Sequence, residues 1–333
     1  MYRWRNENIA IGYPSLEVFL MLFSFEIRLA MFKGFFSGMY ATKSYFYCMK
    51  IIECPRDAMQ GLKEFIPTEN KIRYINALLK AGFDTIDFGS FVSPKAIPQM
   101  RDTAEVIEKI NWKTSRSKLL AIVANARGAR DAATYPGITY LGYPLSVSET
   151  FQQRNTKSSI TDALNTLQDI RNICDAANKK LVVYISMGFG NPYGDPYNAE
   201  LVTQFADILV TLGADVVSLA DTIGASNPAN IKNVFMNLRK QFPTLEPGAH
   251  LHATAKDAKE KVQAAFEAGC RRFDGAIRGF GGCPMANDEL VGNIATEIIV
   301  SYLDEIAVKT DIDRTAFLEA QRVADSIFPA AGH

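Results

Sequence analysis

The sequence predicts a (β/α)₈ barrel, the TIM-barrel class of α/β fold, preceded by an extra N-terminal segment. After Met49 the chain alternates short β-rich runs with amphipathic helical runs, as a parallel sheet with crossover helices does. Eight strand-like runs occur, and no Gly-, Pro- or Ser-rich linker divides them. These observations predict one barrel domain over residues 49–333.

The eight predicted strands are short and rich in apolar and β-branched residues, as buried parallel strands are. In chain order they span residues 50–54, 85–89, 119–124, 138–142, 181–186, 216–220, 249–253 and 272–277. An open doubly wound sheet is the competing fold. No G-x-G-x-x-G turn follows the first strand, so we prefer the closed barrel.

Several predicted helices between the strands have recognisable ends. Ser, Thr and Asn are preferred at the position just before a helix, and Gly is preferred at the position just after it. By these signals helices begin at Thr68, Ser159, Asn198, Asn227 and Ala255 and end near Gly82, Lys179, Gly213, Gln241 and Gly269.

Residues 1–48 are dense in aromatic residues and lack this alternation. Their longest uncharged apolar run, 18–25, is far shorter than the about 20 residues that cross a bilayer, so we expect no membrane partner. A signal peptide and a transit peptide are weaker alternatives, because no clear cleavage site follows and acidic residues are present. We interpret the segment as an added or mistranslated leader that is not part of the fold.

Composition narrows the class of protein. The chain is 48% hydrophobic and 22% charged, which fits a globular protein and argues against a disordered or fibrous one. Its 36 basic residues balance its 36 acidic residues, so we expect no nucleic-acid partner, although a local pocket for a phosphorylated cofactor is compatible with this balance. Five unevenly spaced cysteines indicate reduced thiols in a cytoplasmic protein.

Polar residues gather at the carboxyl ends of the predicted strands, where barrel enzymes carry their active sites. We expect Asp87, Tyr184 and Asp221 to face inward. The full set of candidates comprises Arg56, Asp57, Gln60, Asp87, Tyr184, Asp221, Thr222, His250, His252, Cys283 and Asn293.

His250 and His252 are the only histidines before the final residue, His333. Residues i and i+2 of a strand face the same side, so both imidazoles can bind one ion. A pair of structural histidines is the alternative. Asp57 favours a metal site instead, because it follows strand one, which is the neighbour of strand eight in a closed barrel. Two imidazoles, a carboxylate and a candidate Asn oxygen suit Mg²⁺ or Mn²⁺ better than a structural zinc.

Arg56 and Cys283 are the candidate catalytic groups. A permanent cation beside a metal can stabilise a developing enolate, although a structural salt bridge is the commoner use of a barrel arginine. Cys283 lies in a glycine-flanked loop, and a thiol near a metal and an arginine would have a lowered pKa that suits proton transfer. We expect the other four cysteines to be unreactive.

Together these residues resemble the 3-hydroxy-3-methylglutaryl-CoA (HMG-CoA) lyases, metal-dependent barrels with Arg-Asp after strand one and H-x-H on strand seven. The resemblance extends from Ile51 to about Leu303. Four segments carry it: ECPRDAMQ, GSFVSPKAIPQM, ADTIG, and the run from GFGGCPMA through GNIATE, which ends at Glu297. The second and fourth are typical of the lyases, whereas the related condensing enzymes lack the G-x-G-G-C-P loop.

The resemblance implies a divalent cation, Mg²⁺ or Mn²⁺, held by Asp57, His250, His252 and Asn293. It also implies that Arg56 stabilises enolate charge, that Cys283 is the acid or base, and that Asp221 lies near the substrate hydroxyl. Asp87 is a further catalytic candidate, and the residues expected to contact substrate are Gln60, Tyr184, Thr222 and Glu297.

The implied reaction is a retro-Claisen cleavage that yields acetoacetate and acetyl-CoA. The substrate hydroxyl loses its proton, the carbon–carbon bond breaks, and the acetyl-CoA enolate takes up a proton. An acyl-CoA substrate, a homodimer and a role in leucine degradation accompany this resemblance.

The chain departs from the lyase pattern at four positions. It has Asp87 where glutamate is usual, Ala253 where aspartate is usual, Ala58 where glycine is usual and Val182 where arginine is usual. None is a predicted metal ligand, but the shorter Asp87 withdraws a carboxylate by about one methylene, enough to alter positioning near the reaction centre. The exact acyl-CoA is left open, and the alternatives are a condensing or aldolase-type enzyme and a metal-binding barrel without turnover.

Overall fold

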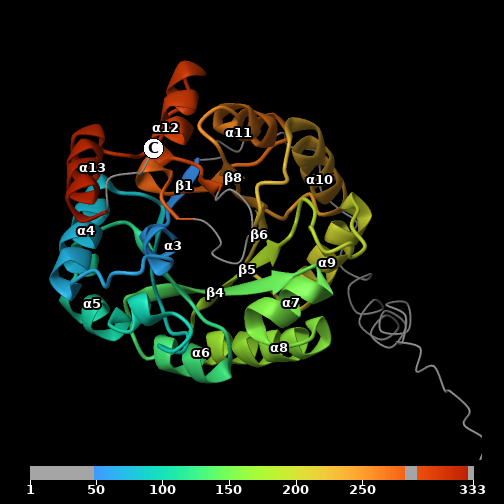
Figure 1. The fold of residues 1–333 in the computed structure, drawn as a ribbon, viewed down its shortest axis with the longest axis horizontal. Helices are drawn as coiled ribbons and strands as arrows, with labels where there is room; N and C mark the ends of the chain where they lie inside the picture. The colour runs from blue at the N-terminus through green and yellow to red at the C-terminus, as the bar shows by residue number, and fades with distance from the viewer. Residues whose placement is uncertain (1–48, 282–290, 329–333) are drawn as a thin grey trace, which may run out of the picture. The chain divides into compact units, whose positions relative to one another are not determined.

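The computed structural model describes residues 49–281 and 291–328, and it confirms the predicted barrel (Figure 1). Eight strands form a closed ring in the order β1-β2-β3-β4-β5-β6-β7-β9, and helices surround it (Figure 1). All eight neighbouring pairs are parallel. The barrel strands are β1 (Lys50–Glu53), β2 (Thr85–Ser90), β3 (Lys118–Ile122), β4 (Ile138–Ser146), β5 (Lys180–Ser186), β6 (Val216–Ala220), β7 (Gly248–His250) and β9 (Arg272–Gly275).

The helices follow the strands along the chain, as the predicted alternation requires. They are α3 (Pro55–Gln60), α4 (Thr68–Ala81), α5 (Thr103–Lys109), α6 (Ala126–Ala133), α7 (Glu149–Thr156), α8 (Ile160–Ala176), α9 (Ala199–Thr211), α10 (Pro228–Gln241), α11 (Ala258–Glu267), α12 (Thr296–Glu305) and α13 (Arg314–Ile327). Short 3₁₀ turns occur at Pro98–Met100, Trp112–Thr114 and Ile277–Gly279.

Three predicted helix starts are confirmed by their side chains. Ser159, Asn198 and Asn227 each accept a hydrogen bond from a backbone N–H in the first turn of α8, α9 and α10. This contact satisfies a donor that has no partner within the helix.

Helix α4 begins at Thr68, as predicted, but Thr68 does not cap it: the residue before the helix is Pro67, and the Thr68 hydroxyl donates to Asp102. The start predicted at Ala255 was wrong. Helix α11 begins at Ala258 rather than Ala255, because Asp257 accepts from the backbone N–H of Thr254 and forms a turn there.

The predicted seventh strand, 249–253, is in fact two strands. β7 ends at His250 and belongs to the barrel, whereas β8 (His252–Ala253) pairs with β10 (Gly292–Asn293) in a separate two-stranded antiparallel sheet. His252 and Asn293 are partners in that sheet. The pairing brings a segment that follows the last barrel strand back beside His252.

The core has two parts because side chains on each strand alternate between the barrel interior and the helices. The larger part lies between the strands and the surrounding helices. The smaller part fills the barrel interior and consists of Leu120, Ile122, Tyr140, Val182, Tyr184 and Val216.

Two predictions concern residues outside the described ranges: the interpretation of residues 1–48 as a leader, and the placement of Cys283. Within the described ranges, Cys54, Cys174 and Cys270 are buried free thiols. None of the helices in the same ranges has the length and hydropathy needed to cross a membrane.

Candidate active site

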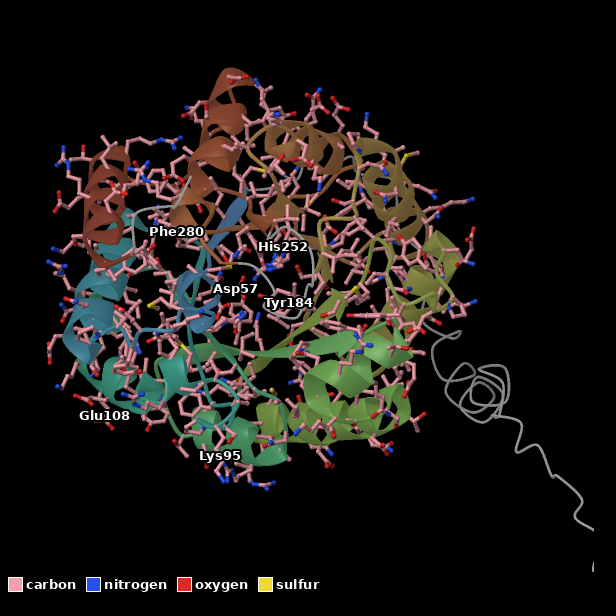
Figure 2. The ribbon with its side chains drawn as sticks, viewed as in Figure 1. Asp57, Lys95, Glu108, Tyr184, His252 and Phe280 are labelled. Atoms are coloured by element: carbon pink, nitrogen blue, oxygen red, sulfur yellow. The ribbon has the colours of Figure 1, made fainter. Side chains whose placement is uncertain are left out.

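A cavity of about 350 Å³ opens at the carboxyl ends of the strands. Figure 2 shows Asp57, Tyr184 and His252 near the centre of the barrel, far from Lys95 and Glu108 at its periphery. The predicted site residues that line the cavity are Arg56, Asp57, Gln60, Tyr184, Thr222, His250 and His252.

Helix α3 places three of these residues immediately after β1. Pro55 is its first residue, a position where proline costs no hydrogen bond. Arg56 donates through Nη1 to Oδ1 of Asp57 and to Oε1 of Gln60, both at 2.8 Å, and Gln60 donates through Nε2 to the same Asp57 oxygen at 2.7 Å. One helical turn thus fixes all three side chains together.

Asp87 holds the guanidinium of Arg56 from behind and does not line the cavity. Arg56 donates to Oδ2 of Asp87 through Nε at 3.0 Å and through Nη2 at 2.5 Å. Burial lowers the pKa of Arg56, but Asp87 and Asp57 more than offset this effect and hold it above its ordinary value. Burial raises the pKa of Asp87 to about 6, although the neighbouring Arg56 opposes the shift.

Asp57, His250 and His252 form a cluster in which one ligand atom from each lies within 4.8 Å of the others. Both ring nitrogens of His252 are buried and have no hydrogen-bond partner among the described residues. Burial, with His250 nearby, lowers the pKa of His252 to about 4. Burial raises the pKa of Asp57, but Arg56 and the two histidines outweigh it and bring the value to about 2.

This cluster fits a divalent cation. At neutral pH it offers an ionised carboxylate and a neutral imidazole, the forms that bind metals. A buried imidazole nitrogen without a partner is costly, and a metal ion would satisfy it. The donors are imidazole nitrogens and a carboxylate oxygen, both of which are ligands of divalent metal ions in proteins.

Asn293 joins the cluster through the pairing of β8 with β10. Its Nδ2 donates to Oδ2 of Asp57 at 2.7 Å and to the carbonyl of Phe280 at 2.9 Å. Gly281 allows this approach, because a Cβ there would lie 2.7 Å from Nδ2 of Asn293 and 2.8 Å from the Asp57 carbonyl. The φ of Gly281, 94°, also favours glycine.

Two further groups surround His250. Its Nδ1 lies 3.2 Å from Oδ2 of Asp274. Burial lowers the pKa of His250, but Asp274 more than offsets this effect, so the pKa is raised. The Tyr184 ring meets the His250 ring edge-on at 5.7 Å, and the buried Tyr184 hydroxyl has no hydrogen-bond partner among the described residues.

The prediction that Asp221 faces inward was wrong. Side chains alternate along β6 and just beyond it, so Ala220 and Thr222 line the cavity and Asp221 points away from it. Its Oδ2 accepts from the hydroxyl of Ser226 at 2.5 Å and from Nζ of Lys261 at 3.4 Å. Burial raises the pKa of this carboxyl, and Lys261 opposes the shift.

Glu297, predicted to contact substrate, does not line the cavity either. It lies in the first turn of α12 and accepts hydrogen bonds from the backbone N–H and the guanidinium of Arg278. Thr222 does line the cavity, and its hydroxyl accepts from the backbone N–H of Met187 at 2.9 Å.

The sequence interpretation missed four residues around the site. Arg154, Asn155 and Thr156, at the end of α7, line the cavity. They follow the fourth strand, so the rule that directed attention to the carboxyl ends of strands could have found them. Asp274 gave no local signal, because its partner His250 lies on a different strand.

A closed parallel barrel with a carboxylate and two histidines clustered at its carboxyl end defines a barrel enzyme with a candidate divalent-metal site. The family model described as HMGL-like matches residues 49–324. The chain therefore belongs to the HMGL-like family, and the resemblance seen in its motifs is confirmed.

Individual relatives agree with this family. The chain is 35% identical over 268 residues to hydroxymethylglutaryl-CoA lyase YngG of Bacillus subtilis, covering 80% of this chain and 89% of that protein. It is 32% identical over 270 residues to the 3-hydroxy-3-isohexenylglutaryl-CoA/hydroxymethylglutaryl-CoA lyase of Pseudomonas aeruginosa, covering 81% and 89%. The solved HMG-CoA lyase of Acinetobacter baumannii, in complex with coenzyme A and 3-methylmalate, superposes with a TM-score of 0.79 at 31% identity, covering 87% of this chain and 93% of that one.

Proposed function

We propose that this protein is a metal-dependent carbon–carbon lyase that cleaves HMG-CoA to acetoacetate and acetyl-CoA. The observation that carries the proposal is the cluster of Asp57, His250 and His252 beside the fixed guanidinium of Arg56. The relatives described above are named as lyases of HMG-CoA, and the solved relative with bound coenzyme A supports an acyl-CoA substrate.

Asp57, His250, His252 and Asn293 would hold Mg²⁺ or Mn²⁺. When bound, such a cation supplies positive charge that favours the ionised form of a substrate hydroxyl. Arg154 and Asn155 widen the set of polar side chains that the cavity presents to a substrate.

Arg56 is proposed to stabilise the negative charge that forms when the carbon–carbon bond breaks. Cleavage of the carbon–carbon bond leaves an enolate on the acetyl-CoA fragment, and a permanent cation in the cavity wall stabilises its oxygen. Asp87, Asp57 and Gln60 hold the guanidinium in place before the reaction, so little reorganisation is needed as the charge develops.

The remaining predicted residues are proposed either to contact the substrate or to position other groups, according to where they lie. Tyr184 and Thr222 line the cavity and are proposed to contact the substrate. Asp87 is proposed to position Arg56, and Asp221 to position the segment after β6 through Ser226. Cys283, outside the described residues, stays the proposed acid or base of the proton transfers.

The test is a cleavage assay on the purified full chain. We expect acetoacetate release from HMG-CoA that requires added Mg²⁺ or Mn²⁺ and stops in EDTA. Arg56→Ala and Cys283→Ala should abolish turnover, whereas Cys174→Ala, which changes a buried cysteine in α8, should not. Full activity in both site variants would refute the assignment.

One observation favours a second substrate, a 3-hydroxyglutaryl-CoA with a larger apolar group at the 3-position. Val92, Ile97, Ile122 and Phe151 give the cavity an apolar wall. Comparing kcat/KM for HMG-CoA and a longer 3-alkyl analogue decides between them. An equal or higher value for the analogue would favour the second substrate.

A cytoplasmic homodimer that binds no nucleic acid is part of the same proposal. The equal numbers of acidic and basic residues support the absence of a nucleic-acid partner. Light scattering on the purified chain measures the oligomeric state, and a monomer would contradict the proposed dimer.

A further inference from the structure

Asp274, on β9, is a buried carboxylate to which the proposed mechanism assigns no role. Its side chain is 0% exposed, and its Oδ2 lies 3.2 Å from Nδ1 of His250. Its other oxygen, Oδ1, is buried and has no hydrogen-bond partner among the described residues. The contact therefore joins a carboxylate of unassigned function to a proposed metal ligand.

The register of the barrel creates this contact. β7 and β9 are neighbouring parallel strands, and His250 and Asp274 are paired across them. Adjacent strands lie about 4.8 Å apart, so two paired side chains on the same face meet directly. The sheet, rather than a loop, thus fixes the carboxylate beside the ring.

Arg272 places a positive charge near the same carboxylate. It precedes Asp274 by two residues on β9 and therefore lies on the same face of the strand. Its guanidinium is buried, and burial lowers the pKa of Arg272, but Asp274 contributes to holding the pKa above its ordinary value.

We infer that Asp274 is a positioning residue for metal binding: it accepts a hydrogen bond from Nδ1 of His250 and leaves the lone pair of Nε2 for the cation. The inference rests on the proposed metal-dependent function. A neutral imidazole carries one N–H and one lone pair, and a carboxylate can only accept, so their contact selects the tautomer. Outer carboxylates of this kind orient a histidine ring and raise its basicity toward a metal.

The structure also offers a competing arrangement. Cys54, His250 and Asp274 have ligand atoms within 4.8 Å of one another, so Asp274 could be a metal ligand itself in a site that shares His250. Cys54 and Asp274 are both buried and absent from the cavity lining, whereas Asp57 and His252 line it. Access from the cavity favours the site at Asp57 and leaves Asp274 behind the ring.

The first test needs no metal. The chain has only three histidines, so long-range ¹H–¹⁵N spectra of the metal-free protein at alkaline pH can resolve each imidazole. We expect the Nδ1–H tautomer for His250 in the wild type and its loss in Asp274→Ala. The Nε2–H tautomer in the wild type would overturn the inference.

The second test measures Mn²⁺ binding by electron paramagnetic resonance. Asp274→Asn and Asp274→Ala should weaken binding about 10- to 100-fold. Asp274→Glu should recover part of the loss, because it restores a carboxylate. Asp274→Asn keeps the shape of the side chain, so it serves if the alanine variant does not fold.

Cys54→Ser is the matched control, since Cys54 belongs to the competing cluster and is equally buried. Unchanged Mn²⁺ affinity in this variant supports the inference, and a loss as large as that of Asp274→Asn would overturn it by placing the metal at Cys54. Wild-type affinity in Asp274→Asn would overturn the inference and leave the proposed function standing. Failure of the wild type to bind Mn²⁺ would overturn both.

Discussion

Replacing Glu53 by glutamine should make the protein more stable at alkaline pH. Glu53 is the last residue of β1 and is fully buried. Its Oε1 accepts from the backbone N–H of Ile277 at 2.8 Å and its Oε2 accepts from the hydroxyl of Thr296 at 2.6 Å, with no salt bridge among the described residues. Glutamine has the same shape and can keep both contacts, because the Thr296 hydroxyl can rotate to accept.

The size of the effect follows from the pKa of this carboxyl. Burial raises the pKa of Glu53 from 4.5 to about 8, so the folded state keeps a proton that the unfolded state releases over that pH range. The contribution of Glu53 to the free energy of unfolding is therefore fully present below pH 4.5 and is lost as the pH rises through 8. Between pH 5 and pH 8.5 the difference in pKa between the folded and unfolded states lowers the free energy of unfolding by about 4 kcal/mol for this one group.

The assay is urea unfolding of the wild type and Glu53→Gln at several pH values, in EDTA so that metal binding does not contribute. The free energy of unfolding of the variant should exceed that of the wild type by an amount that grows by about 4 kcal/mol over this range. Glu108→Gln removes the same charge from an exposed side chain and is the control, with no such growth expected (Figure 2).

Equal pH slopes for the wild type and Glu53→Gln would refute the reasoning, since they would mean that Glu53 releases its proton equally in both states. A constant loss of stability in the variant at every pH would also refute it. That result would show that the two hydrogen bonds, rather than the charge, decide the contribution of Glu53.

Three other changes have defined outcomes. Arg56→Lys loses the bidentate contact with Asp87, so kcat should fall by about 100-fold in the cleavage assay. Its Mn²⁺ affinity, measured by electron paramagnetic resonance, should be retained. An unchanged kcat would contradict the role of the guanidinium. Lys261→Met leaves the buried Asp221 without its cation, so urea unfolding should show a loss of about 3 kcal/mol; wild-type stability would contradict this. Gly281→Ala places a Cβ against the Asp57 carbonyl and should weaken Mn²⁺ binding by about 10-fold in a titration, whereas an unchanged affinity would show that the loop adapts.

Much of the fold could be predicted because its signals are local. Asn198 and Asn227 cap helices through bonds to residues two or three positions away, and Gly82 ends a helix through its own φ of 73°. The alternation of strand and helix then suffices to predict a parallel barrel. Likewise, His250 and His252 stand two positions apart in the chain, and both line the cavity although β7 ends at His250 and β8 begins at His252.

The same reasoning failed where a contact depends on a distant partner. Asp221 is next to two cavity-lining residues, but its carboxylate contacts Lys261 on α11, 40 residues away in the chain. The break of the seventh strand after His250 also has a distant cause, because the second half pairs with β10 instead of a barrel strand.

The sequence by itself determined the barrel, the pair of inward histidines and the Arg56–Asp57 step, since each depends on residues within a few positions of one another. Only the tertiary structure decided that Asn293 lies against Asp57, that Asp87 holds Arg56 and that Asp274 contacts His250. These contacts depend on the closure and register of the sheet, which result from the packing of all the strands and helices together.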